Sequence, residues 1–291
     1  MIECVPNFSE GRDRAKVAAI ADAISSVEGV VLLGRELDAD HNRSVITFAG
    51  APDAVLEAAL RGVGKAAELI DLNRHQGVHP RVGAADVVPF VPLADSSMDE
   101  CIRIAQLAGR GIWRRFGIPV YLYEAAARRP GRQALQNVRR TGFDGLPPDY
   151  GGTGSHPTAG AACVGARQFL VAYNADLATQ DVSIAKAIAK TIRESSGGFA
   201  HVKAIGLFLE SRQRAQVSMN LTDFKQIALD ELYSAIEQEA ARLGTSIDSS
   251  ELIGFIPRAA LEKAPAFFRR IRGFDESRVI EGRIRQLLDS R

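Results

Sequence analysis

Residues 29–70, GVVLLGRELDADHNRSVITFAGAPDAVLEAALRGVGKAAELI, contain the pattern that decides the fold. Two apolar stretches, residues 29–37 and 43–50, predict strands, and the polar residues DADHN between them predict a turn. The next stretch, residues 52–70, repeats apolar side chains at helical spacing and opens with Pro52, which the first helical turn tolerates. The segment therefore predicts a β-hairpin followed by an amphipathic helix.

The elements on either side complete a longer order. Residues 1–8 predict a strand and residues 14–24 a helix before the hairpin, and ADVVPFVPL, residues 85–93, predicts a strand after it. The order is βαββαβ. Pro89 and Pro92 predict that the last strand lies at a sheet edge or contains a bulge, because proline cannot donate to a strand ladder.

A further helix and strand are predicted next in the chain. Ser97 and Glu100 form a capping box that predicts the start of the helix. IPVYLY, residues 118–123, predicts the strand. Residues 124–165 are then irregular and rich in glycine and proline, which predicts a long connecting loop.

The second half of the chain repeats the βαββαβ order. ELIGFIPRAAL, residues 251–261, takes the place of DVVPFVPLADS, residues 86–96, because both contain Phe, a β-branched residue and Pro. The prediction is an α+β fold of two ferredoxin-like subdomains from an apparent duplication, each an antiparallel sheet with helices on one face. We expect the N-terminal subdomain over 1–168 and the C-terminal subdomain over 169–291.

Composition limits the classes of function. The chain has 291 residues, of which 46% are hydrophobic, so one or two folded domains are expected. It has 36 basic and 35 acidic side chains and a net charge of +1, which favours neither a nucleic-acid nor a membrane partner. Cys4, Cys101 and Cys163 lack CxxC spacing, which argues against a disulfide scaffold or a zinc site. With neither a secretory signal nor an apolar run of spanning length, a cytoplasmic location is expected.

Two histidines stand four residues apart in HQGVHPRVGAADVVPFVP, residues 75–92. A shared metal ion would require a helix from His75 to His79, but Gly77 and Pro80 disfavour it, so no metal is expected. His79, beside Arg81, suits general acid–base catalysis near neutral pH. The residues alone leave a structural loop histidine as the alternative.

Other polar residues also have two interpretations. Arg43 is either a bidentate carboxylate clamp or an exposed hairpin arginine. Asp38 and Asp40 either orient a histidine or only make the turn polar. GGTGSHPTAG, residues 151–160, allows the backbone to approach a ligand closely, but it is neither a dinucleotide fingerprint nor a P-loop.

Five motifs, ECVPNFSEGR, DHNRSV, HQGVHPRVGAADVVPFVP, GARQFLVAYN and QVSMNLTDF, together resemble the glutamate formimidoyltransferase family, in the type that stands alone in many bacteria. The resemblance covers residues 2–262. It implies a homodimer of ferredoxin-like subdomains that transfers a formimidoyl group from N-formimidoyl-L-glutamate to N5 of tetrahydrofolate and releases L-glutamate in histidine degradation. Tetrahydrofolate is then a co-substrate, and His79 matches the catalytic histidine of the family's HPR motif.

The resemblance also implies the binding residues. The folate-binding segment maps onto Gly151, Gly152, Thr153, Gly154, Ser155, His156, Pro157, Thr158, Ala159 and Gly160. It lacks the aromatic residues of the animal pattern, which leaves the backbone and His156 as candidate contacts. Both substrates carry carboxylates, and the candidate substrate-binding residues are Asp38, His41, Asn42, Arg43, Arg81 and Arg167.

Two alternatives to formimidoyl transfer stay open at this point. One is transfer of a formyl group from N-formyl-L-glutamate on the same scaffold, because the two donors differ only by NH against O at the transferred carbon. The other is a ferredoxin-like module that binds a small molecule without chemistry.

Overall fold

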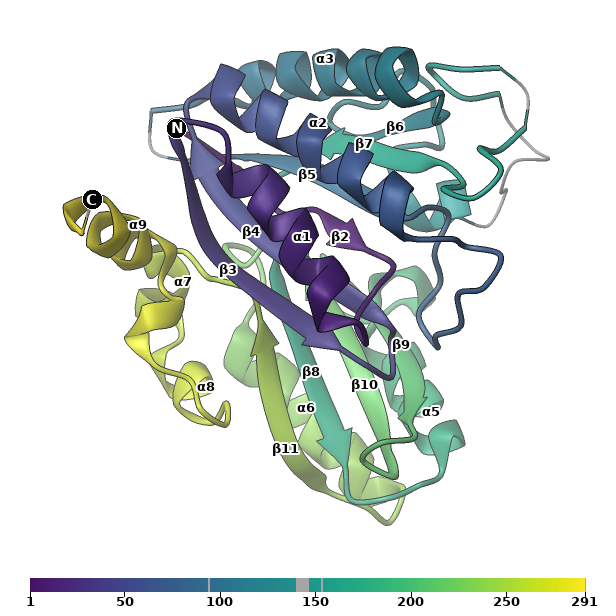
Figure 1. Cartoon of the computed structure of the whole chain (residues 1–291). Coiled ribbons are helices and arrows are strands. Elements are labelled where there is room, and N and C mark those ends of the chain that lie inside the picture. The colour runs from purple at the N-terminus through teal and green to yellow at the C-terminus, as the bar shows by residue number, and fades with distance from the viewer. Residues whose placement is uncertain (94, 140–146, 153, 291) are drawn as a thin grey trace. The chain divides into compact units, whose positions relative to one another are not determined.

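The computed structural model describes residues 1–93, 95–139, 147–152 and 154–290. The chain divides into two compact units, Met1–Gln168 and Phe169–Arg291. Each unit contains one β-sheet with helices packed on a face of it (Figure 1). The predicted α+β class with two ferredoxin-like units is confirmed, since both sheets contain strands in the order that this fold requires.

Unit 1 contains a mixed sheet. Its elements are β1 (Ile2–Cys4), β2 (Asn7–Phe8), α1 (Arg14–Ser25), β3 (Val30–Asp38), β4 (Arg43–Gly50), α2 (Pro52–Leu69), β5 (Ala85–Pro92), α3 (Met98–Phe116), β6 (Val120–Glu124) and β7 (Ala162–Ala166). β1 and β2 lie between β4 and β5, and β3 pairs with the outer side of β4. β7 and β6 then extend the sheet beyond β5 by parallel pairing. The prediction of a purely antiparallel sheet was therefore wrong for unit 1. β7 begins inside the stretch predicted as loop, residues 124–165. It was not predicted because its small residues, ACVGA, give little strand signal.

The prediction of an edge position for β5 was wrong. β5 pairs with β1 and β2 on one side and with β7 on the other. Pro89 has no N–H to donate to the neighbouring strand. It lies opposite Val5 and Pro6, where the first strand is interrupted between β1 and β2, and Val5 N–H donates to the Pro89 carbonyl at 3.3 Å. A bulge is present, but at Asp86 rather than at a proline.

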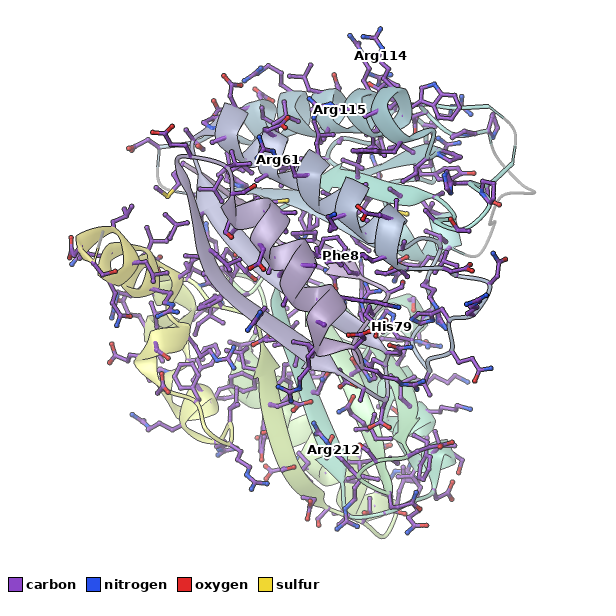
Figure 2. All side chains as sticks on the ribbon, viewed as in Figure 1. Phe8, Arg61, His79, Arg114, Arg115 and Arg212 are labelled. Carbon is purple, nitrogen blue, oxygen red and sulfur yellow. The ribbon has the colours of Figure 1, made fainter. Side chains whose placement is uncertain are left out.

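Helices α1, α2 and α3 lie side by side on one face of the sheet of unit 1 (Figure 1). Asp13 caps α1 by accepting the N–H groups of Ala15 and Lys16, and Ser97 caps α3 as predicted. Phe8 is fully buried in the core beneath these helices. On the outer surface Glu57 of α2 accepts from Arg61 and from Arg115 of α3, so that one carboxylate joins the two helices (Figure 2).

A second apolar cluster lies on the other face of this sheet. It consists of Val87, Tyr121, Tyr123, Val138, Ala161 and Cys163. The connection between β6 and β7 supplies its cover, since residues 135–139 are helical and Val138 is buried. The buried Arg132 fixes this connection, because it donates to the Asp149 carboxylate at 2.6 Å and to the Pro147 carbonyl.

Unit 2 has the same strand order as the core of unit 1. Its elements are β8 (Val171–Leu177), α5 (Val182–Ile192), η1 (Glu194–Ser196), β9 (Val202–Leu209), β10 (Arg214–Leu221), α6 (Leu229–Arg242), β11 (Ile247–Ile253), α7 (Arg258–Lys263), α8 (Pro265–Arg269), η2 (Glu276–Arg278) and α9 (Ile280–Asp289). The four strands pair antiparallel in the order β11-β8-β10-β9. Of the stretch 251–261 expected to contain the last strand, only residues 251–253 belong to β11. The Phe-Ile-Pro residues lie beyond its end at Ile253, and Pro257 directly precedes α7. Among the described helices of the chain, none is long and apolar enough to cross a membrane.

We expect Arg132→Met to lower the free energy of unfolding by about 3–5 kcal/mol, because it leaves the Asp149 carboxylate buried without its cation. Denaturant unfolding followed by circular dichroism measures the change. The double variant Arg132→Met/Asp149→Asn should recover part of the loss, since an asparagine still accepts the Leu122 N–H that Asp149 binds at 2.8 Å. A double variant as unstable as the single one would contradict this assignment.

Candidate active site

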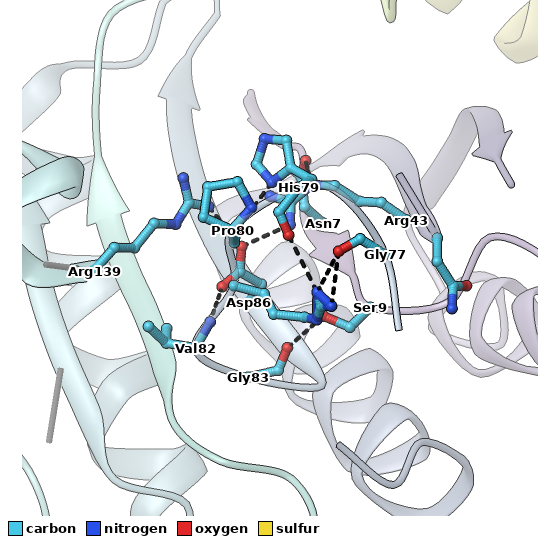
Figure 3. A network of polar contacts seen from close by, with 12 residues as sticks. Asn7, Ser9, Arg43, Gly77, His79, Pro80, Val82, Gly83, Asp86 and Arg139 are labelled. Carbon is cyan, nitrogen blue, oxygen red and sulfur yellow. Dashed lines mark hydrogen bonds and ion pairs between the residues drawn. The ribbon is translucent and has the colours of Figure 1, made fainter. Parts of the chain in front are cut away.

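The centre of the candidate site is the Asp86 carboxylate in the bulge of β5. Asn7 pairs with Val87 and Phe8 with Ala85, so Asp86 is the extra residue between them. Its side chain is fully buried, and Oδ2 accepts from Arg43 Nη1 and from Arg139 Nη2, each at 2.6 Å. Oδ1 accepts the Val82 N–H at 2.7 Å (Figure 3).

These partners keep Asp86 ionised. Burial raises the pKa of Asp86, but the positive charges of Arg43 and Arg139 outweigh it, and the pKa lies at about 2 against an ordinary 3.8. Two guanidinium groups share this one carboxylate, so the cluster carries an excess of one positive charge. Such an excess attracts anionic groups of a ligand.

Arg43 reaches Asp86 from β4. Its Nε donates to the Asn7 side-chain oxygen at 3.1 Å, and only 11% of its side chain is exposed. The interpretation as an exposed hairpin arginine is therefore wrong. Arg139 was missed by sequence reasoning, because it belongs to no recognisable motif. It comes from the helical residues 135–139, and the buried Val138 beside it anchors that segment.

His79 lies beside this cluster on the loop that precedes β5 (Figure 3). Its Nδ1 is 2.8 Å from the Pro80 carbonyl oxygen. Since a carbonyl only accepts, Nδ1 carries the proton and Nε2 keeps the basic lone pair. Burial lowers the pKa of His79 well below its ordinary value, and the nearby charges of Arg43 and Arg139 lower it further. The imidazole is therefore neutral at neutral pH.

Arg81 stabilises residues 75–82, the histidine loop, which carry His79. Its guanidinium donates to the Gly77 carbonyl at 3.1 Å and to the His79 carbonyl at 3.2 Å. These bonds fix the backbone on both sides of Val78. Arg81 thus supports the histidine loop in this structure, and its assignment to a substrate carboxylate stays a prediction.

The turn between β3 and β4 packs against the same loop. Asn42 adopts a left-handed backbone, with φ of 46°, and its side chain accepts the Gly11 N–H at 2.9 Å and donates to the Gln76 carbonyl at 2.8 Å. Its own carbonyl accepts from Nε2 of His75 at 2.9 Å. Gly77 passes so close to the turn that a Cβ there would overlap the His41 carbonyl oxygen. Asp38 accepts the His41 N–H at 2.8 Å, which closes the turn.

The glycine-rich segment is residues 151–160, and its end, residues 156–160, forms a tight turn that packs against both ends of the histidine loop. His156 and Gly160 exchange backbone hydrogen bonds, and Nδ1 of His156 accepts the Ala159 N–H at 3.0 Å. The Thr158 carbonyl accepts from Leu72 at 2.8 Å, and Ala84 N–H donates to the Ala159 carbonyl at 2.9 Å. These bonds lie on both sides of the histidine loop, so residues 156–160 are attached to the chain at each end of that loop.

The beginning of the glycine-rich segment is more open. Gly151 adopts a φ of 120°, and a Cβ there would lie 3.3 Å from the half-exposed ring of Trp113. Gly152 and Gly154 have free space around them, Ser155 is exposed, and Thr153 lies outside the described residues.

The structure brings most of the predicted site residues together. Asp38, His41, Asn42, Arg43, His79 and Arg81 all lie in or against the loop that precedes β5. Arg167 is placed elsewhere: its N–H donates to Phe90, near the other end of β5, and its guanidinium donates to the Gln168 carbonyl. In the parts of the chain that the structure describes, no group of three His, Cys, Asp or Glu side chains is arranged to hold a metal ion.

Comparison with known families matches both units of this chain. Residues 1–167 match the formiminotransferase domain, N-terminal subdomain, and residues 172–287 match the formiminotransferase domain. The chain belongs to the formiminotransferase family. This confirms the resemblance predicted from the five motifs.

Individual formiminotransferase relatives align over nearly the whole chain. A glutamate formimidoyltransferase from Thermoplasma acidophilum is 43% identical and covers 97% of this chain and 96% of its own length. One from Streptococcus pyogenes serotype M1 is 44% identical, with 94% and 95% covered. The formimidoyltransferase-cyclodeaminase of Rattus norvegicus is 40% identical and covers 92% of this chain, which spans 52% of that relative.

Replacing Asp86 by Asn should lower the free energy of unfolding by about 3–5 kcal/mol at neutral pH, since two partly buried arginines lose their common anion. The folded-state pKa of Asp86 is lowered, so its stabilisation is present above pH 3.8 and is lost as pH falls toward 2. The difference in Tm between the parent protein and Asp86→Asn should therefore shrink between pH 4 and 2. A difference that is constant with pH would argue against the ion pairs.

The charge of Arg139 has a separate consequence for His79. In Arg139→Met the pKa of His79 should rise toward its ordinary value, because a nearby positive charge is removed. NMR titration of the ring signals, assigned with His79→Asn, measures this pKa. Arg128→Met is a matched control, since Arg128 donates to Tyr150 and not to Asp86. An unchanged pKa in Arg139→Met would show that Arg139 does not act on His79.

Proposed function

We propose that this formiminotransferase transfers a formimidoyl group from N-formimidoyl-L-glutamate to N5 of tetrahydrofolate and releases L-glutamate. Relatives that carry the name glutamate formimidoyltransferase, 43–44% identical over almost the whole chain, support this activity. The observation in the site that carries the proposal is His79, a neutral imidazole whose Nδ1 is bonded to its own loop and whose Nε2 is available as a base.

The reaction needs such a base. N5 attacks the amidine carbon of the donor, a bond from N5 to carbon forms, and a tetrahedral intermediate results. Nε2 of His79 takes the proton that N5 loses, and a proton must reach the glutamate nitrogen before its bond to carbon breaks. A pKa below neutrality keeps the imidazole in its basic form when the substrates bind. Holding the two substrates in the reactive geometry supplies much of the remaining acceleration.

The charge of the site supports anionic substrates. N-formimidoyl-L-glutamate and tetrahydrofolate both carry carboxylates, and the cluster of Arg43, Arg139 and Asp86 has one positive charge in excess. Arg139 Nε is buried and has no hydrogen-bond partner among the described residues. A substrate carboxylate near His79 would complete this arrangement, since arginine suits carboxylate recognition.

We also assign tetrahydrofolate to residues 151–160. The open space at Gly152 and Gly154 allows close approach to the backbone, and the docking of residues 156–160 beside the histidine loop supports a shared site for both substrates. On this proposal residues 1–168 carry both the catalytic loop and the folate segment. A homodimer, a cytoplasmic location and the absence of a metal requirement stay predictions.

Purified protein should convert tetrahydrofolate when N-formimidoyl-L-glutamate is present. The change in the absorbance of the folate measures this conversion. His79→Ala should lower kcat by roughly 10²–10⁴-fold while the fold is retained, because it removes the acid–base group. The same assay with N-formyl-L-glutamate separates the two donors. Turnover with the formyl donor alone would replace the proposed reaction, and activity with neither donor would favour a binding module.

A further inference from the structure

The backbone of the turn that carries His41 is held by contacts from three segments of unit 1. Its N–H donates to the Asp38 carboxylate at 2.8 Å, within the turn. The following residue, Asn42, bonds both to Gly11 near the N-terminus and to Gln76 in the histidine loop. The His41 carbonyl packs against Gly77 without room for a side chain. The backbone at His41 is therefore fixed against the loop that carries His79.

The ring of His41 faces the ring of His79. Their centroids are 5.7 Å apart, with an angle of 36° between the planes. His41 is 8% exposed, and its Nε2 is buried with no hydrogen-bond partner among the described residues. Buried polar atoms in folded proteins almost always have a partner. The free nitrogen beside the proposed base therefore points to a group that a bound substrate supplies.

We propose that His41 is a second catalytic residue, which donates a proton to the departing glutamate nitrogen while His79 accepts the proton from N5. This inference rests on the proposed function. The bond from N5 to the formimidoyl carbon forms, and the bond from that carbon to the glutamate nitrogen breaks. The proton taken by His79 returns to His41 directly or through solvent, so the pair is restored after each turnover.

Two groups fit this chemistry better than one because the two protons belong to different nitrogens. Nδ1 of His79 is committed to the Pro80 carbonyl, which leaves only Nε2 for proton transfer. In the intermediate, N5 and the glutamate nitrogen are bonded to the same carbon. Because the two rings are 5.7 Å apart, N5 can lie within hydrogen-bond reach, about 3 Å, of His79 while the glutamate nitrogen lies within reach of His41. His79 then has no need to turn between the attacking and the leaving atom.

The test compares His41→Gln with the parent enzyme in kcat, KM and pH profile. Gln keeps a polar side chain but cannot exchange a proton near neutral pH, so kcat should fall by roughly 10²–10⁴-fold with small changes in KM. The dependence of kcat on pH should lose the decline on one side of its maximum, because one of the two acid–base groups is removed. The double variant His41→Gln/His79→Ala should be little slower than the slower single variant, since groups that act in one step are not additive.

His201→Asn is the control, because His201 belongs to unit 2 and its hydrogen bonds to Glu194 and Thr222 use backbone atoms, which asparagine retains. It should keep the parent kcat. Exogenous imidazole should restore turnover to His41→Ala, a variant whose fold is checked by circular dichroism.

The outcomes separate the two proposals. A parent protein without formimidoyl transfer would overturn the proposed function itself. An active parent whose His41→Gln variant keeps kcat within threefold, or changes only KM, would overturn the role of His41 and leave the proposed function standing.

Discussion

The arrangement of the candidate site depends on one buried carboxylate, Asp86. It lies in a bulge of an interior strand and binds two arginines that come from segments far apart in the chain. Without this anion, two guanidinium groups would repel each other at the start of β5. Its other oxygen accepts the Val82 N–H, so the same carboxylate also fixes the chain that leads from the histidine loop into the strand. The placement and the charge of the site thus have a common origin.

Much of the fold follows from local pattern, but the contacts of the site do not. Strand alternation, helical spacing, the Pro52 at the start of α2 and the Ser97 cap of α3 are local properties, and the first two predicted the βαββαβ order of each unit. β7 was missed because its residues are small, and the interior position of β5 was missed because it depends on a break in another strand. Arg139 was missed for a related reason, since only packing of its segment on Val87 and Cys163 brings it to Asp86. The pairing of distant segments is a tertiary property that no single segment encodes.

The two units share a strand order, but each contains a different network around a buried aspartate. In unit 2 Arg212 (Figure 2) donates to the Asp176 carboxylate at 2.8 Å and to Glu251 at 3.2 Å. Gln216 donates to the other oxygen of Asp176. This network holds two acids and one base, whereas the Asp86 network holds one acid and two bases. The two networks therefore have opposite excess charge. Among the residues that the structure describes, only unit 1 has the added strands β6 and β7 and the connection that delivers Arg139.

The chain contains a single tryptophan, Trp113, at the end of α3. The residue is 38% exposed, and its ring lies near Gly151, where the glycine-rich segment begins. Indole emission depends on the polarity and motion of its surroundings, so this residue is a native optical reporter at that position. Events at the segment can be followed in the unmodified protein, with neither a dye nor an introduced cysteine, and without interference from a second indole.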